Sequence, residues 1–374
     1  MAVGGRPEEV KLFLCGDVMT GRGLDQALPH PGDPHLYEPY VSSATRYVEL
    51  AEAKNGPIPA PVDYSYPWGD ALADLGRVGP DARIINLETS ITTSDRPWRG
   101  KGVHYRMHPA NAPCIGAAAV DCCVLANNHV VDWGFTGLRE TLRVLETVGI
   151  ETAGAGLDSE DAAAPAVLET AGGRQVLVFG FGTATSGIPG AWAARTNRPG
   201  VNLLYDLSSS TVQGIAGRIE KVKPEGGVVV ASIHWGPNWG YDVPAAEREF
   251  AHRLIEDAGA DVVHGHSSHH FKGIEVHRGR PILYGCGDFL NDYEGISGRE
   301  EYRSDLALLY FPVLTSTGEL VRLTLSPMSI RRFRLNRPTP ADVEWVRDTL
   351  NREGKRFGTW VEAGSAGDLE LRWT

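Results

Sequence analysis

Short apolar runs that end in polar side chains recur along this sequence. Six runs have the length and branching of buried strands: Lys11–Cys15, Arg83–Leu87, Asp121–Leu125, Gln175–Phe181, Gly227–Ile233 and Asp261–Val263. Five polar clusters lie just past the carboxyl ends of such runs: Gly16-Asp17-Val18-Met19, Asn86-Leu87-Glu88, Ala126-Asn127-Asn128-His129, Ile233-His234-Trp235-Gly236 and Gly265-His266-Ser267-Ser268-His269. Strands of an α/β sheet open their ligand sites at these ends, so the clusters are predicted to converge on one cleft. Their donor atoms predict a metalloenzyme.

Helical patterns alternate with the apolar runs. We expect helices at Phe135–Val148 and at Pro244–Ala258, where proline opens the first turn and Gly259 closes the last. The alternation predicts a layered α/β architecture. Beyond Lys272, strands joined by Gly or Arg-Gly turns predict a second, partly antiparallel sheet. They are Gly273–Val276, Pro281–Tyr284, Leu306–Leu314 and Glu319–Ser326.

The chain is long enough to bury the core of one large domain spanning residues 1–374. The segment 27–68 is rich in proline, tyrosine and histidine and is too long for an ordinary connection, which predicts a lid over the site. Residues 330–374 are expected to pack on the domain as a C-terminal extension. The net charge of −11 disfavours nucleic acid as a partner.

The five cysteines indicate a reducing compartment. They are odd in number, two are adjacent, and several lie in apolar stretches, which is typical of buried free thiols. The amino terminus lacks a signal-peptide pattern, and no segment is long enough to span a bilayer. We therefore expect a cytoplasmic protein without a membrane anchor.

The motifs GDVMTGR, NLETSIT, ANNHVVDWG, HWG, GHSSHH and RPILYGCGDF follow one another between Val10 and Asp292. In this order they resemble the CapA family, a branch of the calcineurin-like metallophosphoesterases. The resemblance implies a four-layer α-β-β-α sandwich with a lid insertion and a centre for two divalent ions, with Mn, Zn, Fe, Ca and Mg left undistinguished. The implied metal ligands are Asp17, Glu88, Asn128, His234, His266 and His269. Glu88 stands at the superfamily's bridging aspartate, and His129 at its catalytic acid.

Each of these residues also has a structural interpretation. Asp17 could cap a turn, Glu88 could favour a helix start, and His234 could be an interior imidazole with a satisfied hydrogen bond. Which of His264, His266, His269 and His270 bind metal is left open. Taken together, the motifs favour the ligand roles.

Departures from the superfamily pattern weaken simple phosphate-ester hydrolysis. The usual Asp-x-His is Asp17-Val18-Met19, and methionine is a poor ligand for a hard cation. The usual Gly-His-x-His has one residue more between its histidines. These changes leave a metal centre of altered ligation.

The resemblance offers several functions. CapA-like proteins take part in poly-γ-glutamate synthesis or release and are commonly tethered to membranes, whereas this chain shows no tether. A soluble branch that the sequence resembles inverts a Cα centre in lasso-type precursor peptides, and this becomes the leading hypothesis, with a peptide or poly-amino-acid as partner. Phosphoester hydrolysis and a non-catalytic binding subunit are the alternatives.

Inversion requires stabilisation of an enolate by metal, and proton donors and acceptors on opposite faces of the Cα. His129 is the candidate for one face, and His269, His270, Asp288 and Cys286 are candidates for the other. Arg22 and Arg106 are candidates to hold a terminal carboxylate, although an isolated arginine is more often a surface group. Aromatic side chains are candidates to pack the substrate or to anchor loops: Trp68, Trp98, Trp235, Trp239 and Tyr241.

Overall fold

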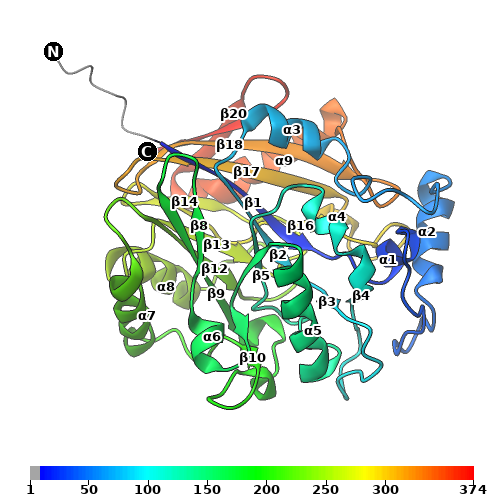
Figure 1. The fold of residues 1–374 in the computed structure, drawn as a ribbon. Coiled ribbons are helices and arrows are strands. Elements are labelled where there is room, and N and C mark those ends of the chain that lie inside the picture. The colour runs from blue at the N-terminus through cyan, green and yellow to red at the C-terminus, as the bar shows by residue number, and fades with distance from the viewer. Residues whose placement is uncertain (1–8) are drawn as a thin grey trace.

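Two large β-sheets form the centre of the computed structural model, which describes residues 9–374 (Figure 1). The ten-stranded sheet has the order β20-β21-β18-β17-β1-β2-β5-β6, with β16 paired to β1 and β19 to β18. Its strands are β1 (Val10–Val18), β2 (Ala82–Leu87), β5 (Cys122–Val124), β6 (Glu151–Ala153), β16 (Asp288–Leu290), β17 (Leu306–Leu314), β18 (Leu320–Ile330), β19 (Leu335–Asn336), β20 (Thr359–Ala363) and β21 (Leu369–Trp373).

The seven-stranded sheet has the order β11-β9-β12-β13-β15-β14, with β8 paired to β9. Its strands are β8 (Ala166–Glu169), β9 (Gln175–Thr183), β11 (Leu203–Leu204), β12 (Val228–His234), β13 (Val262–His266), β14 (Ile274–His277) and β15 (Arg280–Leu283). Two short pairs stand apart: β3 (Ser90–Ile91) with β4 (Arg106–Met107), and β7 (Ala155–Gly156) with β10 (Gly200–Val201). The six strands predicted from apolar runs are thereby confirmed.

The α-helices pack mainly outside the two sheets. They are α1 (Gly23–Ala27), α2 (Thr45–Asn55), α3 (Ala71–Val78), α4 (Pro113–Gly116), α5 (Gly134–Thr147), α6 (Ser159–Ala163), α7 (Ser209–Val222), α8 (Ala245–Glu256) and α9 (Pro340–Gly354). The two predicted helices correspond to α5 and α8. Pro244 precedes α8, and Gly259 has a φ of +78°, a backbone conformation that favours glycine.

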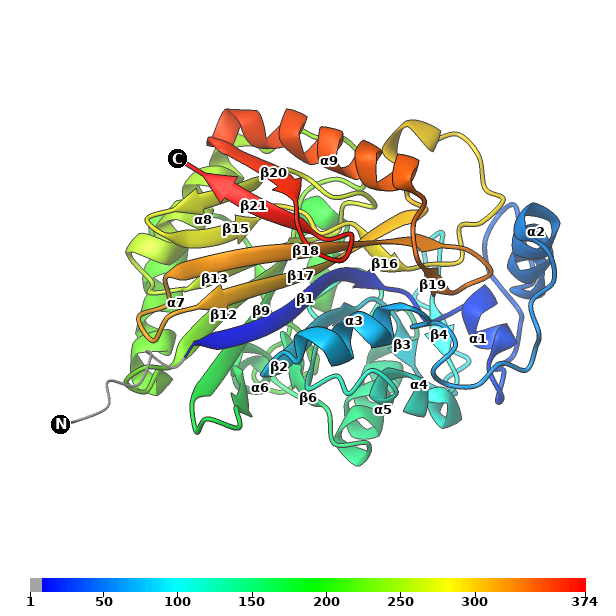
Figure 2. The ribbon, with the colours of Figure 1, turned by 90° about the horizontal axis from the view of Figure 1, so that it is seen from above.

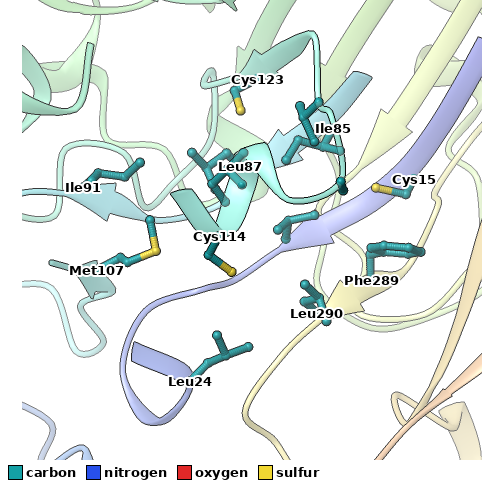
Figure 3. Close-up of a cluster of buried hydrophobic side chains, with 14 of the residues drawn as sticks. Cys15, Leu24, Ile85, Leu87, Ile91, Met107, Cys114, Cys123, Phe289 and Leu290 are labelled. Carbon is teal, nitrogen blue, oxygen red and sulfur yellow. The ribbon is translucent and has the colours of Figure 1, made fainter. Parts of the chain in front are cut away.

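Three hydrophobic cores separate four layers, so the predicted α-β-β-α order is confirmed. One core lies between helices α1–α5 and the ten-stranded sheet; Figure 3 shows its Cys15, Leu87, Cys123 and Phe289. The second fills the space between the sheets, and the third lies between the seven-stranded sheet and helices α7 and α8. All five cysteines are buried and free, as expected.

The strands beyond Lys272 do not form a sheet of their own, so that prediction was wrong. β14 and β15 extend the seven-stranded sheet, whereas β17 runs antiparallel beside β1 in the ten-stranded sheet and β18 pairs with β17 (Figure 2). Alternating apolar residues identify a strand but do not identify its neighbour. In the observed pairing β15 lies beside β13 and β17 lies beside β1, so each strand pair extends one of the two large sheets.

The segment 27–68 contains α2, which packs against α1. It is anchored in the first core by buried side chains: Leu36, Tyr47, Ala51, Ile58, Val62 and Trp68. The C-terminal segment after residue 330 is part of the domain's framework. Its strand β21 pairs with β18, and Val346 and Leu350 of α9 lie in the core between the sheets.

Candidate metal centre

The carboxyl ends of strands from both sheets meet at one place. Asp17 and Glu88 come from the ends of β1 and β2 in the ten-stranded sheet, whereas His234 and His266 are the last residues of β12 and β13 in the seven-stranded sheet. All four side chains are at most 2% exposed. The predicted convergence of the polar clusters is therefore observed, and it occurs across the boundary between the sheets.

Asp17 is a buried carboxylate with neighbours on both sheets. Its Oδ1 accepts a hydrogen bond from Asn86 Nδ2 at 2.7 Å and lies 4.0 Å from His266 Nδ1. Its Oδ2 accepts from the backbone N–H of Ser267 at 3.2 Å. Burial, reinforced by the charge of Asp288, raises the pKa of Asp17 to about 7.

Glu88 has a carboxylate oxygen without a partner. Its Oε1 lies 3.7 Å from His129 Nε2 and 4.0 Å from His234 Nε2, while its buried Oε2 accepts no hydrogen bond. Burial, followed by the charges of Asp17 and Asp288, raises the pKa of Glu88 well above its usual value. A buried, unsatisfied carboxylate beside two others is destabilising unless a cation joins them.

A chain of hydrogen bonds fixes the protonation of His266. His264 Nε2 lies 2.7 Å from the carbonyl oxygen of Cys15, which only accepts, so this nitrogen carries the proton. Burial lowers the pKa of His264 to about 4, so its Nδ1 is bare near neutral pH and accepts the Ser232 hydroxyl proton at 2.9 Å. Ser232 Oγ then accepts from His266 Nε2 at 3.0 Å.

The Nδ1 of His266 consequently carries no proton, and its lone pair is directed at the centre. It lies 2.8 Å from His234 Nδ1, and His234 Nε2 lies 3.1 Å from Asn128 Oδ1. Burial lowers the pKa values of His234 and His266 well below the usual range, which keeps both rings neutral. Neutral imidazole is the form that binds metal.

His269 is paired with Asp288 beside Asp17. His269 Nδ1 lies 2.8 Å from Asp288 Oδ1, and Asp288 Oδ2 accepts from Asn291 Nδ2 at 2.9 Å. Asp17 and Asp288 are register partners on the parallel strands β1 and β16. Burial lowers the pKa of His269, but the charge of Asp288 and its hydrogen bond outweigh burial, and the net shift is upward.

His129 forms a second His–Asp pair. Its Nδ1 lies 2.6 Å from Asp132 Oδ2 and 3.0 Å from Lys101 Nζ, and Lys101 also forms an ion pair with Asp132. Burial lowers the pKa of His129 to about 4, with Asp132 acting in the opposite direction. The ring is therefore neutral near pH 7, and its Nε2 faces Glu88.

The residues fit divalent cations, as the unpartnered Glu88 oxygen indicates. Two groups of three residues place one ligand atom each within 4.8 Å of one another, and both include Asp17. The first adds His234 and His266, and the second adds His269 and Asp288. Asp17 is thus the carboxylate common to both groups, a place that the resemblance assigned to Glu88. Carboxylate oxygens with imidazole nitrogens suit Zn²⁺, Mn²⁺ or Fe²⁺.

The two other candidate histidines, His264 and His270, have structural contacts. His264 links the two sheets through Cys15 and Ser232, as described above. His270 lies beside the centre, where its Nε2 accepts from the backbone N–H of Gly240 at 3.1 Å and its Nδ1 donates to the carbonyl of Phe271 at 3.2 Å. Both nitrogens of His270 are therefore occupied, which argues against a role in proton transfer.

Three side chains predicted to contact substrate have partners within the protein. Trp235 is 2% exposed in the third core, and its indole N–H donates to the carbonyl of Tyr284 at 3.0 Å. Arg22 is buried against Asp292 and Glu38. Arg106 donates to the carbonyls of Ser94 and Asp33 at 2.8 and 2.9 Å. Each side chain is used internally, because a buried tryptophan or arginine requires hydrogen-bond partners.

Tyr241 instead belongs to a half-exposed aromatic wall beside His269. Trp239 lies 5.3 Å from the His269 ring, and Tyr302 lies 5.2 Å from Trp239 and 5.4 Å from Tyr241, measured between ring centroids. The guanidinium of Arg299 lies 5.5 Å from the Trp239 centroid. This wall is a partly exposed aromatic surface in contact with His269.

Met19, a departure from the superfamily pattern, and Cys286, a candidate for proton transfer, are both buried. Met19 is fully buried, and its sulfur accepts from the hydroxyl of Tyr293 at 3.5 Å, so a thioether–phenol contact stands where a histidine ligand is usual. Burial raises the pKa of the Cys286 thiol well above its usual value. A thiol of this kind stays protonated and is a poor base.

Sequence reasoning missed several residues that orient the site. Asp132 stands three positions after His129 within the same motif, and that spacing could have revealed it. Asn127 donates to Asn86 Oδ1 at 3.0 Å and so connects the clusters after β2 and β5. Lys101 lies in a loop without a recognisable pattern, so only the fold reveals its place beside His129.

Comparison with known proteins identifies the chain's relatives. Residues 11–293 match the family described as bacterial capsule synthesis protein PGA_cap. A probable polyglutamine synthesis accessory protein of Mycobacterium tuberculosis is 48% identical over 371 residues, covering 99% of this chain and 97% of the relative. The PGA biosynthesis protein CapA of Bacillus subtilis is 30% identical over 61% of this chain and 54% of its own. The capsule biosynthesis protein CapA of Bacillus anthracis is 26% identical over 76% of this chain and 60% of its own.

Among solved structures, a 5′-nucleotidase precursor from Thermus thermophilus aligns with a TM-score of 0.44 at 15% identity, covering 90% of this chain and 55% of that one. Within the described residues, no helix combines the length and apolar character needed to cross a membrane. The family match spans most of the chain, and the M. tuberculosis relative aligns along nearly its whole length. The chain belongs to the bacterial capsule synthesis protein family PGA_cap, the CapA family.

Proposed function

We propose that this protein is a metal-dependent enzyme that acts on the backbone of a poly-amino-acid or peptide. The observation that carries the proposal is the buried cluster of Asp17, Glu88 and Asp288 facing neutral histidines, with the His129–Asp132 pair beside it. The names of the relatives refer to polyglutamine, PGA or capsule synthesis, which supports a polymer of amino acids as the substrate class.

Divalent ions held by these residues would polarise a carbonyl oxygen of the substrate. His129 supplies a proton acceptor, since Asp132 holds its Nδ1–H and leaves Nε2 bare toward Glu88. Lys101 and Asp132 hold the ring in place from behind. Trp239 and Tyr241 offer the apolar stems of the substrate a surface beside His269.

Among reactions on such a substrate, we favour inversion at a Cα. Inversion needs one group to remove a proton and another to return it, and two His–Asp pairs reach the centre from different loops. Hydrolysis of an amide bond, in contrast, needs one proton-transfer group and an activated water molecule. If His269 binds metal instead, it is unavailable for proton transfer, and hydrolysis becomes the favoured reaction.

The test is mass spectrometry of poly-γ-glutamate and of synthetic glutamyl peptides incubated in deuterium oxide with Mn²⁺ or Zn²⁺. Deuterium gain at constant chain length supports inversion, whereas new chain ends support hydrolysis. His129→Gln should lower turnover at least ~100-fold, and His30→Gln, which alters an exposed histidine outside the centre, should not. Unchanged substrates with fully loaded metal would refute the proposal.

Parallel measurements test two alternative functions. Phosphate release from small phosphate esters would identify a phosphoesterase, for which the family's overall motif order is the supporting observation. Absence of bound metal after reconstitution would identify a binding subunit, for which the replacement of a histidine ligand by Met19 is the supporting observation.

A further inference from the structure

A second cluster of metal-binding side chains lies on the outer face of the seven-stranded sheet. It joins His252 of helix α8 to Glu275 and His277 of strand β14, and one ligand atom of each lies within 4.8 Å of the others. None of its residues belongs to the candidate metal centre. We propose that this cluster is a separate Zn²⁺ site that links helix α8 to the edge strand β14.

The local sequence presents the donors from two regular elements. His252 and Glu256 are four residues apart in α8, and Glu275 and His277 are two residues apart in β14, so each pair shares one face of its element. Residues 274 and 276 of the strand point the other way, where Ile274 and Val276 meet the core between the sheets. The four polar side chains therefore lie in the layer between helix and sheet edge.

The geometry brings the donors together and leaves one of them, His252, without an aligned hydrogen-bond partner. His252 Nε2 is 3.1 Å from Glu275 Oε1, yet it is buried and has no aligned hydrogen-bond partner. The rings of His252 and His277 stack at 3.7 Å between centroids and 4° between planes. His277 Nε2 is 2.8 Å from Glu256 Oε1. Two imidazoles and two carboxylates form a donor set that Zn²⁺ prefers.

Arginines hold the two carboxylates when no ion is bound. Arg248 Nη2 lies 2.8 Å from Glu275 Oε1, and Arg278 Nε lies 2.5 Å from Glu256 Oε1. Both arginines are partly exposed and can turn toward solvent. Ligand atoms around tetrahedral Zn²⁺ are about 3.4 Å apart. The ligand atoms of His252, Glu275 and His277 lie within 4.8 Å of one another, so Zn²⁺ binding requires them to move closer together.

Zinc content after equilibrium dialysis of the full-length protein tests the site. The double variant His252→Gln/His277→Gln should hold one Zn²⁺ equivalent fewer than the wild type. The matched control His30→Gln should hold the wild-type number, because His30 lies outside both clusters. Equal zinc content in the double variant and the wild type would overturn the proposal.

A second measurement uses the wild type alone and does not depend on the folding of a variant. Zn²⁺ should protect His252 and His277 from modification by diethyl pyrocarbonate, as read by peptide mass spectrometry, while the exposed His30 stays reactive. Equal modification of the pair with and without Zn²⁺ would contradict the site. Neither measurement involves substrate turnover, so the outcome is independent of the proposed reaction.

Discussion

Replacing Arg22 by methionine should destabilise the fold. The guanidinium is 4% exposed and donates to Asp292 at 2.5 and 3.1 Å, to Glu38 at 2.8 Å and to the hydroxyl of Tyr47 at 3.0 Å. Methionine fills most of the volume but leaves Glu38 and Asp292 buried without their cation. Breaking a buried ion pair of this kind lowers the free energy of unfolding by ~3–5 kcal/mol.

Urea denaturation followed by tryptophan fluorescence measures this change. The matched control is Arg46→Met, which removes an exposed arginine of α2 whose partner Glu49 is also exposed. That surface pair contributes less than about 1 kcal/mol. Adding Glu38→Gln and Asp292→Asn to Arg22→Met should restore part of the lost stability, because no unpaired charge is then buried.

The result also separates two roles for Arg22. If the side chain held a substrate carboxylate, Arg22→Met would raise KM and leave the free energy of unfolding nearly unchanged. A loss below about 1 kcal/mol, equal to that of Arg46→Met, would refute the buried-network argument. The expected loss would instead show that Arg22 fastens the segment 27–68, through Glu38 and Tyr47, to the body of the domain.

Three further predictions concern the centre and the aromatic residues. Glu88→Gln should raise the stability of the metal-free protein by about 1–2 kcal/mol, because it removes a buried carboxyl whose raised pKa makes ionisation unfavourable in the folded state. It should also weaken metal binding. Calorimetry with and without Mn²⁺ measures both, and a destabilised apo variant would contradict this account. The pKa of Asp17, raised to about 7 from 3.8, implies that metal-free stability due to Asp17 is present at low pH and is lost as pH rises through 7. Thermal unfolding in EDTA at pH 5 and pH 8 should show a larger loss in the wild type than in Asp17→Asn, and equal losses would contradict this account. Trp235→Ala should lower the free energy of unfolding by ~3–5 kcal/mol. Trp239→Ala should change the free energy of unfolding much less and should reduce substrate affinity. Equal destabilisation by both variants would contradict the assignment of Trp235 to the core and Trp239 to the aromatic wall.

The strands and the main site residues could be predicted because their signals are local. A run such as Gly227–Ile233 is so apolar that it is predicted to form a buried strand. A polar residue directly after the run then lies at the carboxyl end of that strand. The four-layer order follows from alternating runs and helices together with the motif resemblance. The pattern predicts that the clusters containing Asp17, Glu88, His234 and His266 converge, and the resemblance supplies their roles as ligands.

The remaining features depend on contacts between distant parts of the chain. Arg22 meets Asp292 across 270 residues, and no local pattern distinguishes a buried arginine with partners from one that binds substrate. Trp235 follows a site histidine directly, but its side chain turns into the opposite core. The choice of sheet for β14 and for β17 is likewise a matter of tertiary packing, which overrides local propensity.

The location of the candidate centre at the boundary between the sheets has a mechanical consequence. Asp17 belongs to one sheet and His234 and His266 to the other, so ions shared among them would act as cross-links between the two halves of the sandwich. The free energy of metal binding would then stabilise the two halves of the sandwich against separation. Chelation should increase amide hydrogen exchange in β1 and β12 together, including at residues of these strands that lie far from Asp17 and His234.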